Sequence, residues 1–84
     1  MVTYMENKII VTMDFYFTAL LLSKGFEMLG SEKHERGVVF IVQNNNENLY
    51  RKLKEQFDKH DAYVNMSKFV KNTALLRKEL DKHK

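Results

Sequence analysis

The side chains best suited to chemistry in this sequence are its three histidines, His34, His60 and His83. Imidazole is the usual acid–base group near neutral pH and a common metal ligand. The three residues fall in a predicted turn, in a loop at a helix end and in the C-terminal tail. None stands four residues from another histidine or pairs with a carboxylate at a recognised metal-ligand spacing. We therefore expect surface histidines without a role, and no metal site.

Phosphate and thiol chemistry also lack their usual residues. The three glycines, Gly25, Gly30 and Gly37, are too widely spaced for a P-loop or a dinucleotide-binding fingerprint. The absence of cysteine removes disulfides, thiol nucleophiles and cysteine-ligated zinc. We predict a non-enzymatic protein with no catalytic residues, no cofactor and no small-molecule substrate.

Basic residues are concentrated in the second half of the chain. Residues 1–43 contain four Lys or Arg and five Asp or Glu, a charge of −1, whereas residues 44–84 contain ten and six, a charge of +4. The cations of interest lie on two predicted helices: Arg51, Lys52, Lys54, Lys68, Lys71 and Lys78. Because such side chains neutralise phosphates, they suggest sequence-independent nucleic-acid binding as an alternative function. Solvated helix faces are the simpler interpretation, and Arg51–Glu55 and Lys54–Asp58 are predicted i, i+4 pairs.

The length of 84 residues corresponds to one small domain spanning residues 1–84, in which residues 1–7 and 81–84 are expected to be loose. Translation could begin at Met1 or Met5. The apolar run at residues 15–22 is too short to span a bilayer, and no basic segment or cleavage site marks a secretory signal. We expect a cytoplasmic protein without membrane contact.

Residues 12–25 organise the predicted fold as a short, almost wholly apolar helix. Thr12 is the predicted N-cap, with Asp14 in the first turn, where a carboxylate complements the amide end of the helix. Gly25 is the predicted left-handed residue that ends the helix. A helix that is apolar on nearly all sides must be enclosed by the rest of the chain.

Three strands are predicted around this helix. The β-branched residues 8–11 precede it, and residues 26–33 and 38–42 form a hairpin whose turn ends at Gly37. Gly30 breaks the first hairpin strand, either as a bulge or as the end of regular pairing. The second hairpin strand is apolar on both faces, so we expect it at the centre of the sheet.

Two further helices follow the hairpin. Leu49, Leu53 and Phe57 mark an amphipathic helix capped by Asn45 or Asn46. A last helix, capped by Asn65 or Ser67, has a predicted buried stripe that consists of Met66, Phe69, Val70, Thr73, Leu76 and Leu80. The prediction is an α+β domain of order β-α-β-β-α-α, with a two- to three-stranded antiparallel sheet packed on helices.

The expected function is that of a small accessory or regulatory protein that binds another protein. A chain this small is expected to leave part of its apolar surface uncovered, at Phe15, Tyr16, Leu29 and Leu75. The partner is either a different protein or a second copy, in a homodimer formed through the sheet edge or the first helix.

The sequence from Thr12 to Leu21, followed by Gly25-Phe26-Glu27-Met28, resembles the signature of a family of small prokaryotic and viral domains of unknown function. The apolar strand Val38–Val42 corresponds to the next element of that family, and the resemblance extends over about residues 12–80. Phe17 and Thr18 depart from the Leu and Ala that the family favours. The resemblance implies the α+β layout and, as the source, a prokaryote or one of its viruses or mobile elements, and it brings no activity. Asp14 and Tyr16, which recur in the signature, are interpreted as a helix-terminus residue and a packing residue.

Overall fold

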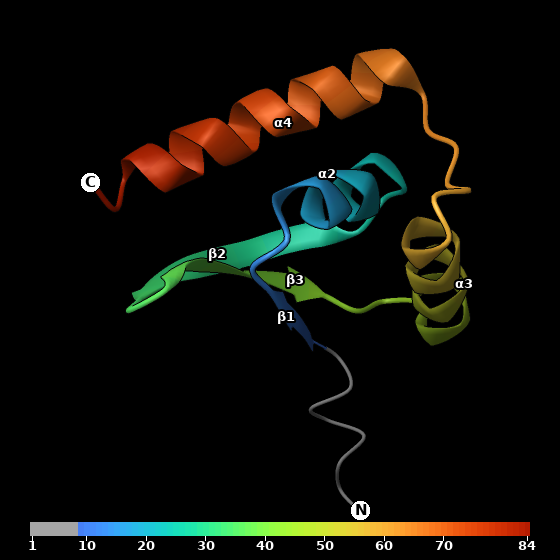
Figure 1. Ribbon diagram of the computed structural model, residues 1–84, viewed down its shortest axis with the longest axis horizontal. Coiled ribbons are helices and arrows are strands. Elements are labelled where there is room, and N and C mark those ends of the chain that lie inside the picture. The colour runs from blue at the N-terminus through green and yellow to red at the C-terminus, as the bar shows by residue number, and fades with distance from the viewer. Residues whose placement is uncertain (1–8) are drawn as a thin grey trace, which may run out of the picture.

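The computed structural model describes residues 9–84, and the predictions for residues 1–7 lie outside that range. The elements follow the order β1 (Ile9–Thr12), α2 (Phe15–Ser23), β2 (Glu27–His34), β3 (Gly37–Gln43), α3 (Glu47–Asp58) and α4 (Met66–Asp81) (Figure 1). This is the predicted α+β fold with its predicted element order. None of the helices in this range has both the length and the apolar content needed to cross a membrane.

The sheet of residues 9–84 is antiparallel and three-stranded, with strand order β1-β3-β2. The central position of β3 confirms the prediction from its apolar run. The register shifts between Met28 and Gly30, so the extra residue Leu29 forms a bulge beside the glycine. The turn of the hairpin consists of residues 35–36, and β3 begins at Gly37. The φ of Gly37 is +141°, a backbone conformation that is strained for residues with a side chain.

The start of α2 differs from the prediction, because the N-cap is Asp14 and not Thr12. Thr12 is the last residue of β1 and pairs with Phe40, so its backbone is committed to the sheet. The Asp14 carboxylate accepts a hydrogen bond of 2.9 Å from the Phe17 backbone N–H, while the Thr12 hydroxyl accepts one from the Asp14 N–H. Two residues, Met13 and the N-cap Asp14, therefore separate the strand from the helix.

The end of α2 is a complete Schellman motif. The Phe26 N–H donates to the Leu21 carbonyl and the Gly25 N–H donates to the Leu22 carbonyl. Gly25 has a φ of +100°, which confirms its predicted left-handed conformation. Phe26 and Leu21 are both buried in the same core cluster, so the motif also fixes the direction in which β2 leaves the helix.

Asparagines cap both later helices, Asn46 for α3 and Asn65 for α4. Each side chain accepts a hydrogen bond from the backbone N–H three residues further on. The predicted buried stripe of α4 is wrong at two residues: Met66 is 68% exposed and Val70 is 56% exposed. The helix approaches the core only from Phe69 onwards, and its buried residues are Thr73 and Leu76.

The core lies between one face of the sheet and the helices. Figure 1 shows α2 between the sheet and α4, with α3 beside them at one end of the sheet. One cluster joins Leu20 and Leu21 of α2 to Val42 of β3 and Leu53 of α3, and a second joins Ala19, Phe40 and Leu76. The buried hydroxyls of Thr18 and Ser23 donate to carbonyls of their own helix, so they add no unpaired polar group to the core.

Candidate functional site

The face of the sheet that points away from α2 and α4 is apolar and uncovered within residues 9–84. We call it the open face and define it by Ile9, Val11, Leu29, Val39 and Ile41. Val11 pairs with Ile41 across the strands, and the bulged Leu29 precedes Gly30, which also pairs with Ile41. Ile9, Val11 and Leu29 are 44%, 56% and 52% exposed, and neither core cluster includes any residue of the open face.

The prediction from the sequence included only Leu29 among these residues. A signal for the others was present, because β3 was recognised as apolar on both faces. Since the described helices that contact the sheet all pack on one side of it, the second apolar face of β3 has no cover. A strand apolar on both faces in a chain with few helices therefore indicates an exposed sheet face.

The four residues predicted to form an interface do not share one surface. Phe15 is half-buried and packs against the second core cluster, and Tyr16 stacks on Phe69 with ring centroids 6.3 Å apart. Tyr16 remains 56% exposed. Leu75 is exposed on α4, on the other side of the sheet from Leu29.

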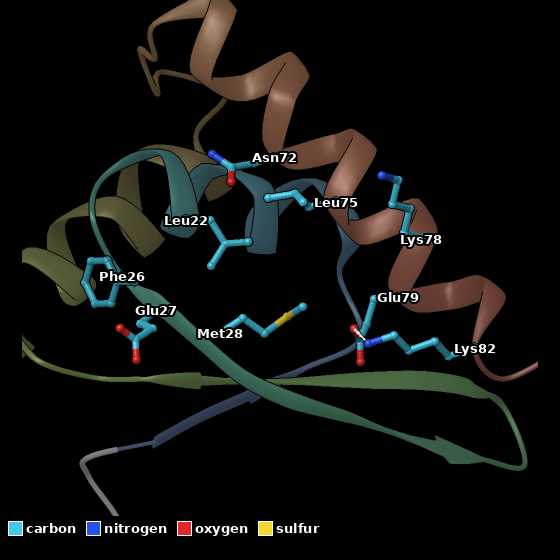
Figure 2. A pocket seen from close by; sticks show the side chains of 9 residues that line it. All are labelled: Leu22, Phe26, Glu27, Met28, Asn72, Leu75, Lys78, Glu79 and Lys82. Atoms are coloured by element: carbon cyan, nitrogen blue, oxygen red, sulfur yellow. Dashed lines mark hydrogen bonds and ion pairs between the residues drawn. The ribbon is translucent and has the colours of Figure 1, made fainter.

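Leu75 borders a groove of about 480 Å³ between α4 and the beginning of β2. Figure 2 shows side chains from α2, β2 and α4 around this space, with Leu22, Met28 and Leu75 as its apolar lining and Lys78 and Lys82 on the α4 side. The groove lies between α4 and the junction of α2 with β2. Its apolar lining identifies a second surface able to receive a hydrophobic side chain.

A polar cluster holds the C-terminal end of α4 against β2 beyond this groove. The Ser31 hydroxyl donates to the Glu79 carboxylate and lies 2.8 Å from Nε2 of His83. Lys33 Nζ also donates to the His83 carbonyl at 3.3 Å. Residues 82–84 are hydrogen-bonded through their backbone N–H groups to Glu79, Leu80 and Asp81, so the end of the chain continues the path of α4.

The Glu79 carboxylate in this cluster should make folding stability depend on pH. The hydrogen bond from Ser31, followed by that from Lys82, lowers the pKa of Glu79 below its ordinary value of 4.5. A lowered carboxyl pKa adds stability above the unfolded-state value, and this contribution disappears as the pH falls through the folded-state pKa.

We expect Glu79→Gln to be less stable than the wild type near neutral pH, and the difference to shrink between about pH 5 and pH 3. Urea unfolding followed by circular dichroism at several pH values would measure it. Asp81→Gln is a suitable control, because Asp81 is exposed and contacts only the exposed Lys84 at the end of the chain among the basic side chains of the described residues. A Glu79→Gln difference that stays constant with pH would contradict the role assigned to this cluster.

The predicted basic residues fall on two helices with different charge environments. On α3, Arg51 pairs with Glu47 rather than with the predicted Glu55, and Lys54 pairs with Asp58 as predicted. The Asp58 hydrogen bond raises the pKa of Lys54.

On α4, Lys68, Lys71 and Lys78 have no ion pair within the described residues, and no acidic residue occurs between residues 66 and 78. Lys52 is exposed on α3. Of the two helices, α4 therefore carries the less compensated positive charge.

The histidines lie apart from one another. His34 is 3.4 Å from the Glu32 carboxylate at the hairpin end, His60 borders a small hollow with Tyr16 and Phe69, and His83 contacts Ser31. Within residues 9–84, no group of three or more His, Asp or Glu side chains is placed to hold a metal ion.

In a comparison with protein families, the family described as "Domain of unknown function (DUF5659)" matches residues 7–81. Neither the curated proteins nor the solved structures yield a match to this chain. The family match covers most of the sequence, from the residues before β1 to the end of α4.

Proposed function

The chain belongs to the DUF5659 family, whose function is unknown, and from this starting point we propose that it is a non-enzymatic protein-binding domain. The open face of the sheet is its binding surface. The observation that supports this proposal is the exposure of Ile9, Val11 and Leu29 on a sheet face without a covering helix among residues 9–84.

Physical chemistry favours an interface at this position. Burying apolar surface is favourable by about 25 cal/mol per Å², and contiguous exposed apolar patches mark interaction sites in soluble proteins. β-Branched side chains such as those of Ile9, Val11 and Ile41 are stiff, so ordering them at an interface costs little conformational entropy. A partner that covers the open face would bury its apolar side chains and so form a second hydrophobic layer on that side of the sheet.

The proposed setting is the cytoplasm of a prokaryote, with the protein serving as an accessory or regulatory factor encoded by a virus or mobile element. The resemblance to small prokaryotic and viral domains supports this setting.

The test compares two lysine substitutions in a capture experiment from host extract, with and without nuclease. Val11 lies on the open face and Val70 on α4, and both are 56% exposed, so Val11→Lys and Val70→Lys are matched. We expect a partner captured by the wild type and by Val70→Lys to be lost with Val11→Lys, because a charge would then be buried without a partner. Capture that Val11→Lys leaves unchanged would contradict the open face as the binding surface. Circular dichroism would verify that both variants are folded.

The uncompensated charge of α4 favours nucleic-acid binding as a second candidate. Three phosphate contacts by Lys68, Lys71 and Lys78 would give a salt dependence that weakens binding about 40-fold when the salt concentration rises fourfold. Retardation of a DNA duplex by the wild type, and its loss in the triple Lys→Gln variant, would support this function. No retardation at about 50 mM salt would exclude it.

A further inference from the structure

One side of α4, which borders the groove at Leu75 and Lys78, has the properties that a partner of the open face requires. Lys68, Lys71, Leu75 and Lys78 lie along one side of this helix, at spacings of three, four and three residues, and we call them the α4 stripe. Leu75 is 48% exposed, and the three lysines are exposed without ion pairs in the described part of the chain. The stripe is thus a basic surface with an apolar side chain at its centre.

The open face has acidic side chains next to its apolar centre. Strand register places Glu27 opposite Gln43 and Glu32 opposite Val39, so both side chains extend from the edge strand β2 on the side of the open face. Glu27 also borders the groove at the beginning of β2. Neither glutamate pairs with a lysine or arginine within residues 9–84, and Glu32 contacts only His34 among the basic side chains. The charge of this face is therefore opposite to that of the α4 stripe.

The two sets of charges also have similar spacings. The β3 partners of the two glutamates, Gln43 and Val39, are four residues apart, which in a strand is about 13 to 14 Å. Lys68 and Lys78 are ten residues apart, which in a helix is about 15 Å. One helix can therefore place a lysine near each glutamate while Leu75 lies over the apolar centre.

From this match we propose that the open face binds the α4 stripe of a second copy of this chain. The inference rests on the proposed function and names its partner. The open face and α4 lie on opposite sides of the domain, with α2 between them (Figure 1). Two copies consequently cannot satisfy both surfaces at once, and the contact repeats head to tail as an open chain of subunits.

Sedimentation of the purified full-length protein provides the first test. We expect the weight-average mass to rise above the monomer mass of 10.0 kDa as the concentration increases, without a fixed end point. Raising the salt from about 50 to 500 mM should reduce the assembly, because salt screens the attraction between the lysines of the α4 stripe and the glutamates of the open face. A monomer at all concentrations, or a closed dimer, would overturn the inference.

Two blocked variants give the sharper test. Val11→Lys blocks the open face by placing a charge in it, and the double variant Lys71→Glu, Lys78→Glu reverses two charges of the α4 stripe. Each variant alone should therefore be monomeric. Mixed in equal amounts, they retain one intact surface each and should form a dimer of about 20 kDa, twice the monomer mass. A mixture that stays monomeric would overturn the head-to-tail contact.

The proposed function is judged separately by the host-extract experiment. A foreign protein captured through the open face, together with a monomeric purified chain, would retain the proposed function and reject self-assembly. Self-assembly that persists in Val11→Lys would reject the open face as the self-assembly surface, and the proposed function would then be judged by the capture experiment alone.

Discussion

Replacement of Leu76 by alanine is expected to lower the free energy of unfolding by about 2 to 5 kcal/mol. Leu76 is completely buried and packs with Ala19 of α2 and Phe40 of β3, so it attaches the last helix to both other layers. The alanine would leave a cavity that the short α2 cannot fill. A single core of this size contributes only a few kcal/mol of net stability, so the variant should be largely unfolded or close to it.

Leu75→Ala is the matched control for this experiment, because the neighbouring leucine is 48% exposed. We expect its effect on stability to be within about 0.5 kcal/mol. Urea denaturation followed by circular dichroism at 222 nm would give both midpoints. Equal midpoints for the two variants would contradict the position of Leu76 in the core.

Phe40→Ala is expected to have the largest effect on stability, about 3 to 5 kcal/mol. Phe40 is 1% exposed on the central strand, and its ring makes an edge contact with the Phe15 ring at 6.4 Å. Its removal takes away apolar contacts with both α2 and α4 at the same position.

We expect Phe40→Ala to lose the dispersed proton NMR spectrum of a folded protein, and Phe40→Leu to retain it, because leucine refills most of the space. Tyr63→Ala is the aromatic control, since Tyr63 is 82% exposed. A folded Phe40→Ala variant with wild-type stability would show that the sheet and helices do not depend on this contact.

Local sequence signals predicted the elements of this fold well. Asn46 and Asn65 cap their helices, Gly25 ends α2, and the bulge lies next to Gly30, because each depends on interactions within a few residues. The error at Thr12 arose where two local signals compete. Threonine is both an N-cap and a strand former, and pairing with Phe40 in the sheet decided between them.

Burial along α4 was less predictable. The periodic apolar pattern is correct for Thr73 and Leu76 but not for Met66 and Val70, although all four fit the same spacing. Periodicity shows which residues share a side of a helix, whereas burial also requires a neighbouring element at that level. Met66 and Val70 belong to neither core cluster, whereas Phe69, between them in the sequence, stacks on Tyr16 of α2.

The α+β class, the element order, the central position of β3 and the positive charge of the last helix follow from the sequence. The packing of the helices on one face of the sheet does not follow from it, and this packing leaves Ile9, Val11 and Ile41 without cover in the described chain. The same holds for the pairing of Ser31 with Glu79 and His83, which are about 50 residues away along the chain. Alternation along a strand assigns residues to two faces, but the path of the later helices determines which face they cover.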